Sequence, residues 1–153
     1  MLTEKDYCDY ETCVALKELG FSEPTLAYYH GFLSSKPLLY LVIDEDCMPE
    51  DGVNVFDLLS NSNKYKDSKN VNAPTLWEAQ KWLREEKKII IEVTFNLMYK
   101  GQPRFSWRVL YNLTQHKGAY YTFDSVMSKE DYDSYEEALS EGIKKAVKIL
   151  KER

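Results

Sequence analysis

The side chains best suited to catalysis are few and widely separated in this chain. The two histidines are His30 and His116, and the three cysteines are Cys8, Cys13 and Cys47. A nucleophilic serine or cysteine needs a base within hydrogen-bond reach, and no Gly-x-Ser-x-Gly turn is present to hold a serine nucleophile. His30 falls in a predicted strand and His116 in a predicted turn. We therefore expect no catalytic residues and a protein that is not an enzyme.

Two features of the first half could in principle bind a metal ion. Cys8 and Cys13 are five positions apart, so on one helix their side chains would point in different directions. Structural zinc sites use cysteine pairs that are more closely spaced. The acidic residues of 44–51 could offer oxygen ligands to a hard cation, but their spacing is not that of an EF-hand loop. Because the glycines are also scattered and form no phosphate-binding loop, we expect no metal and no cofactor.

Basic residues gather in one part of the second half. Residues 87–117 carry six lysines or arginines and one acid. If Arg104, Arg108 and Lys117 stood on an open sheet face beside aromatic side chains, they could contact a single-stranded nucleic acid. An ordinary polar sheet face, with cross-strand pairs, explains the same residues. The formal net charge of −5 argues against general affinity for phosphate, so nucleic-acid binding is the alternative function.

The aromatic residues favour protein contact. The chain contains 12 tyrosines and 3 tryptophans, which combine apolar area with a polar tip and are common at interfaces. Trp77 is expected on the side of its helix away from Leu76 and Leu83, unless a loop such as 60–73 covers it. Trp77 and Tyr120 are therefore the predicted interface residues, with a protein partner or a second copy as the ligand.

The elements that would position these residues are organised around one strand, 88–98. Every second residue from Ile89 is apolar, which predicts one buried face. Strands at 104–113 and 119–123 should follow it as an antiparallel meander. Helices at 75–87 and 134–152, which begin at capping-box sequences, should cover the apolar face. That predicted face consists of Ile89, Ile91, Val93, Phe95 and Leu97 with Phe105, Trp107, Val109, Tyr111 and Leu113.

The first part of the chain predicts a smaller arrangement. A helix over 6–20 should end at Gly20, with Phe21 packing back on Leu16. Strands at 26–32 and 38–43 should pair as a hairpin.

The residues 44–73 read as an irregular acidic-to-polar insert, with one short helical turn at 53–59. The predicted fold class is α+β, a mainly antiparallel sheet of about five strands packed with two or three helices. We expect one domain over 1–153, made of a 1–43 helix and hairpin, the 44–73 insert and a 74–153 helix, three strands and helix.

The amino-terminal sequence is acidic and has no apolar run, so it does not predict a secretory signal. No stretch approaches the roughly 20 apolar residues that a membrane span requires. An odd number of cysteines gives no disulfide framework. We therefore expect a reduced, cytoplasmic protein that does not bind membranes.

Three segments support a resemblance to a known group. They are 73–85 (APTLWEAQKWLRE), 133–143 (DSYEEALSEGI) and 17–24 (KELGFSEP). Together they resemble small uncharacterised proteins encoded by phages and prophage-like elements of gut bacteria. That group has no assigned activity, so the resemblance implies a setting and no site. The predicted function is that of a small accessory protein of mobile-element type, acting through protein–protein contact.

Overall fold

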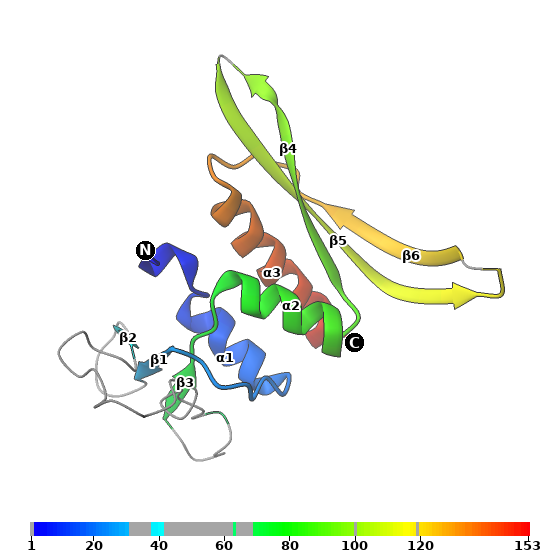
Figure 1. Cartoon of the computed structure of the whole chain (residues 1–153). Coiled ribbons are helices and arrows are strands. Elements are labelled where there is room, and N and C mark those ends of the chain that lie inside the picture. The colour runs from blue at the N-terminus through cyan, green and yellow to red at the C-terminus, as the bar shows by residue number, and fades with distance from the viewer. Residues whose placement is uncertain (1, 31–37, 42–62, 64–68, 100, 119) are drawn as a thin grey trace, which may run out of the picture. The chain divides into compact units, whose positions relative to one another are not determined.

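The computed structural model describes residues 2–30, 38–41, 63, 69–99, 101–118 and 120–153. The described residues form an α+β fold with three α-helices and six antiparallel strands in two three-stranded sheets (Figure 1). The chain divides into two compact units that meet between Thr75 and Leu76, and residues 2 and 4–6 belong to the second unit. This boundary lies beside the predicted start of the 74–153 segment.

In its described residues the first unit contains one α-helix, α1 (Tyr10–Glu18), which is shorter than the predicted 6–20. Gly20 has a φ of 98°, the left-handed conformation that glycine adopts without strain. The N–H of Phe21 donates to the carbonyl of Leu16 at 2.9 Å, and both side chains are buried. The helix therefore ends in the predicted Schellman motif. A separate 3₁₀ turn, η1 (Glu4–Asp6), precedes α1 in the sequence.

The first sheet has the order β2-β1-β3, with all pairs antiparallel. The predicted hairpin is confirmed by β1 (Ala27–His30) and β2 (Leu38–Leu41). The third strand, β3 (Asn70–Asn72), lies in a segment predicted to be irregular, so the described residues form six strands where about five were predicted. The helical turn predicted at 53–59 lies outside the described residues.

The strand β3 was missed because its sequence is a poor strand signal. Asn72 is fully buried, although asparagine is depleted in strands. Its side-chain Nδ2 donates to the carbonyl of Glu23 at 2.7 Å, and its Oδ1 accepts from the N–H of Asn63 at 3.3 Å. Tertiary hydrogen bonds therefore hold this residue in a strand that local propensity does not favour.

The second unit contains the predicted helix, meander and helix. The three strands are β4 (Ile90–Tyr99), β5 (Gln102–His116) and β6 (Tyr120–Met127), in the order β4-β5-β6. The two helices are α2 (Leu76–Glu86) and α3 (Tyr135–Lys151). As predicted, the Ser134 side chain caps α3 by accepting from the N–H of Glu137 at 3.1 Å. The strand β6 runs four residues beyond its predicted end at 123.

The face of this sheet that packs on α3 is called the inner face, and the opposite one the outer face. Gly142 of α3 approaches the inner face so closely that a Cβ there would lie 2.8 Å from Cγ2 of Ile91 and 3.3 Å from Cβ of Trp107. Ile89, Ile91 and Val109 are buried. The prediction that helix 134–152 covers this face is confirmed for these residues.

The prediction is wrong for Phe95, which is 56% exposed. The hairpin of β4 and β5 extends past the first turn of α3 (Figure 1), so the helix cannot reach its tip. Phe95 packs edge-on against Phe105 instead, with ring centroids 5.7 Å apart. Phe105 in turn meets Tyr135 at the start of α3. The side chain of Leu97, also assigned to this face, lies outside the described residues.

Candidate interaction surface

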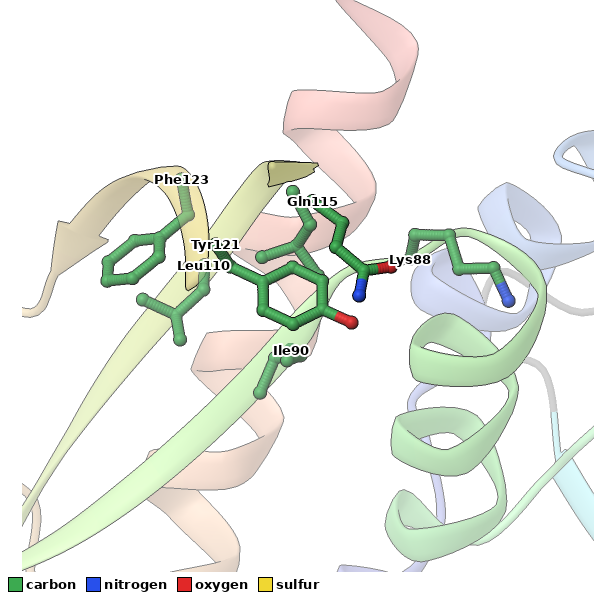
Figure 2. Close-up of a pocket in the computed structure, with 7 residues that line it drawn as sticks. Lys88, Ile90, Leu110, Gln115, Tyr121 and Phe123 are labelled. Atoms are coloured by element: carbon green, nitrogen blue, oxygen red, sulfur yellow. The ribbon is translucent and has the colours of Figure 1, made fainter. Parts of the chain in front are cut away.

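A groove of about 590 Å³ lies on the outer face of the β4-β5-β6 sheet. The residues that line it are mostly apolar, with one lysine and one glutamine at its end beside α2 (Figure 2). The lining residues are Lys88, Ile90, Leu110, Leu113, Gln115, Tyr121 and Phe123. The volume is typical of ligand-binding clefts.

One extra residue in β5 determines which side chains of that strand face the groove. Tyr111 pairs with Asp124 and Thr114 pairs with Thr122, so β5 advances three positions while β6 advances two. This is a β-bulge, which shifts the alternation of side chains beyond it. Leu113 therefore lies in the groove with Leu110, and the prediction that it belongs to the inner face is wrong.

Asn112 is the residue that makes the bulge. Its φ is 54°, a left-handed conformation that asparagine tolerates better than most residues. Its Nδ2 donates to Oδ2 of Asp124 at 2.6 Å, and its Oδ1 accepts from Nη2 of Arg153 at 2.7 Å. The side chain thus connects the distorted backbone of β5 to β6 and to Arg153, which follows α3.

The outer face of β6 is apolar and exposed. Tyr121, Phe123 and Met127 alternate along the strand and are 56%, 48% and 63% exposed. Ser125 completes the same face. The sequence prediction ended this strand at 123 and did not treat these residues as a site. The sequence signal was partial, since the apolar period of two is interrupted at Ser125 and resumes at Met127.

The residues predicted to contact nucleic acid do not form an open basic patch. Nη2 of Arg108 lies 2.6 Å from Oε2 of Glu92, its cross-strand neighbour. Arg104 forms an ion pair with Asp133 and donates to the carbonyl of Asp131 at 2.9 Å. The simpler explanation, cross-strand pairing, is therefore observed for Arg108, whereas Arg104 pairs with the segment that follows β6.

The third predicted nucleic-acid residue, Lys117, is exposed in the turn after β5. Arg104 lies near the opposite end of that strand, so the structure does not bring the two together. Trp77, a predicted interface residue, is 41% exposed in the first turn of α2 and does not line the groove. Tyr120 pairs through its backbone with His116, and its side chain lies outside the described residues.

The thiols and histidines have structural partners in the described part of the chain. Cys8 and Cys13 are buried, and the Cys13 thiol donates to the Cys8 carbonyl at 3.4 Å. Burial raises the pKa of Cys13 well above its usual range, and the nearby Cys8 and Asp9 raise it further. Nε2 of His116 lies 2.9 Å from Oγ1 of Thr122, while the His30 ring packs against Tyr40. Cys47 lies outside the described residues.

In the described residues, no three His, Cys, Asp or Glu side chains gather as ligands for a metal ion.

No protein-family model, curated protein or solved structure matches this chain. The helices that the structure describes are too short or too polar to span a membrane.

Proposed function

We propose that this protein is a non-enzymatic accessory protein of mobile-element type, which acts by binding a protein through the outer face of the β4-β5-β6 sheet. The observation that supports this proposal most directly is the exposed groove formed by Leu110, Leu113, Tyr121 and Phe123. Interface centres are enriched in aromatic side chains and depleted in charge. The groove has that composition.

The energetics of the surface support a protein ligand. Completing the burial of a half-exposed phenylalanine or tyrosine contributes on the order of 1 kcal/mol. Tyr121 and Phe123 also project from a strand, so little backbone conformational freedom is lost when they are covered. Several such contacts together stabilise a complex when the surface of the partner is also apolar and complementary in shape.

The polar groups near the groove do not favour a phosphate backbone. Lys88 is the one charged residue in its lining, and its Nζ donates to the carbonyl of Glu85 at 2.5 Å. Figure 2 shows this side chain directed away from the groove. Because Arg104 and Arg108 are also engaged by carboxylates, contact with nucleic acid would first require breaking internal ion pairs.

Site-specific photo-crosslinking in the cells that make the protein tests the proposal. A photoreactive phenylalanine analogue at Phe123 should give a discrete protein adduct on irradiation. The same analogue at Phe95, which is similarly exposed on the inner face, is the matched control and should give much less. The analogue is also placed at Trp77. If that position alone gave an adduct, the interface would lie on α2 instead. Equal, diffuse labelling from all three positions would contradict a specific protein contact.

A further inference from the structure

We propose that a second copy of the chain pairs antiparallel with β6, about a two-fold axis at Phe123, at the edge of this surface. The inference goes beyond the proposed function, because edge pairing joins the two outer faces and leaves both grooves open. It begins from the edge of the second sheet. In the described part of the chain, β6 pairs with β5 on one side and with no strand on the other. An uncovered edge presents backbone N–H and carbonyl groups to any extended segment.

At two other places along the edges of this sheet, the backbone forms hydrogen bonds with groups of the same unit. Nε2 of Gln80 in α2 donates to the carbonyl of Ile91 in β4 at 2.9 Å. Beyond the end of β6, Tyr132 continues the pairing with β5, since its backbone exchanges hydrogen bonds of 2.9 and 2.7 Å with Phe105. No comparable described group bonds the outer edge of Tyr120–Met127. Among the described residues, β6 is thus the edge strand with no such bond, whereas β4 accepts one at Ile91.

The sequence of β6 contains no lysine or proline, and its one inward-pointing charge is Asp124. Natural edge strands are protected by lysine, proline or inward-pointing charges. The only charged residue of β6 is Asp124, and that carboxylate already accepts from Asn112 of the neighbouring strand. Charge therefore does not oppose the addition of another strand.

Charge and length then select one register. With the axis at Phe123, all positions of 120–126 are paired, and Asp124 lies opposite Thr122 of the second copy. An axis at Asp124 would place two carboxylates directly opposite each other, which is unfavourable. An axis at Thr122 or Ser125 would pair fewer residues. Phe123 opposite Phe123 therefore combines the longest ladder with no like-charge contact.

This register also brings the exposed apolar side chains of the two copies to the same side of the joined sheet. In an antiparallel pair, opposite residues point to the same face, so Phe123, Tyr121 and Ser125 of the two copies share one side. The two outer faces become one surface of a six-stranded sheet. Isologous pairing of this kind is the usual symmetry of homodimers. The two grooves would lie on the same side of the joined sheet.

Sedimentation equilibrium of the full chain at increasing concentration tests the inference. We expect the mass to rise from 18.0 kDa towards twice that value, with a dissociation constant in the micromolar range because the ladder is short. Phe123→Lys places two cations at the axis and should weaken association at least tenfold. Met127→Lys makes the same change on the same face, outside the paired 120–126, and should leave association unchanged.

Both substituted side chains are exposed, so thermal unfolding should confirm that each variant is folded. Oxidative cross-linking adds a register-specific readout. Phe123→Cys should form a disulfide-linked dimer, whereas Ser125→Cys should not, because its equivalent in the second copy would be four positions away along the strand. Wild-type protein controls for the native cysteines.

The outcomes separate this inference from the proposed function. A chain that stays monomeric, while the photoadduct at Phe123 contains a different protein, overturns the dimer and leaves the proposed function standing. A monomer with no specific adduct overturns both. A dimer that resists Phe123→Lys, or that links as readily through Ser125→Cys, overturns the β6 register.

Discussion

Gly142 is the residue at which α3 comes closest to the sheet. In an exposed helix, Gly→Ala is stabilising by about 1 kcal/mol. Here a Cβ would lie 2.8 Å from Cγ2 of Ile91, and the β-branched side chain of isoleucine has little freedom to move. The close packing thus makes Gly142→Ala destabilising, although helix propensity alone would make it stabilising.

We therefore expect Gly142→Ala to lower the free energy of unfolding by about 1–3 kcal/mol, the usual cost of overpacking. Urea denaturation measures this change, and Ser140→Ala, two positions earlier on α3, should not share it. In a double-mutant cycle, Ile91→Ala should remove part of the Gly142→Ala penalty. Strict additivity of the two changes would show that this contact is not its cause.

The Cys13 thiol makes stability depend on pH. Burial raises its pKa in the folded state, whereas an unfolded thiol titrates near pH 8.5. The stability contributed by the protonated thiol is fully present below that pH, and is lost as the pH rises from there through the folded pKa.

Above about pH 8.5 we expect the free energy of unfolding to fall by up to ~1.4 kcal/mol per pH unit from this group. Cys13→Ala should show a shallower slope, although its absolute stability will differ. Urea unfolding at several pH values measures both slopes. Parallel curves for the two proteins would exclude a contribution from Cys13.

At the scale of the elements, the bulge in β5 determines which side chains reach the groove. The left-handed φ of Asn112 is compatible with glycine or asparagine but is strained for a β-branched residue. We expect Asn112→Val to cost about 1–3 kcal/mol in stability, and Asn112→Gly to stay within about 1 kcal/mol of wild type.

Thr114→Val is the matched control, because Thr114 is also exposed in β5 but lies beyond the bulge. Its effect should stay within about 0.5 kcal/mol. Thermal and urea unfolding report all three variants. If Asn112→Val were as stable as Thr114→Val, the bulge would not depend on the backbone conformation of this residue.

The same bulge shows where sequence periodicity stops being informative. Alternation correctly located β4 and β5, which carry the buried Ile91 and Val109, and the start of β6, where polar and apolar side chains also alternate. It placed Leu113 on the wrong face, since a single extra residue inverts every later side chain. It also gave no sign that Phe95 extends past α3, because helix length and crossing position are tertiary properties.

For the whole molecule, fold class was more predictable than the candidate site. The amphipathic helices α2 and α3, which follow capping-box sequences, and the meander between them carry strong local patterns. The interaction surface depends on which face of the sheet remains uncovered, and that follows only from the placement of α3. Tyr121 and Phe123 therefore resembled ordinary strand residues until the inner face was assigned to Ile91 and Val109.

Charge was similarly ambiguous in the sequence. The bases of 87–117 predicted an alternative site, but their acidic partners are Glu92, across the ladder from Arg108, and Asp133, distant in sequence from Arg104. The cross-strand pair could be anticipated once the register was known. The contact with Asp133 could not, because it depends on the path of the chain after β6.

The position of α3 after the three strands has a consequence during biosynthesis. While the ribosome is still making the residues between Met127 and Val147, the apolar side of the meander has no helix to cover it. At ~5–20 residues per second, this delay lasts roughly one to a few seconds. The nascent chain is therefore most dependent on chaperones in that interval, and ribosomes stalled before Val147 would carry the protein in its most aggregation-prone form.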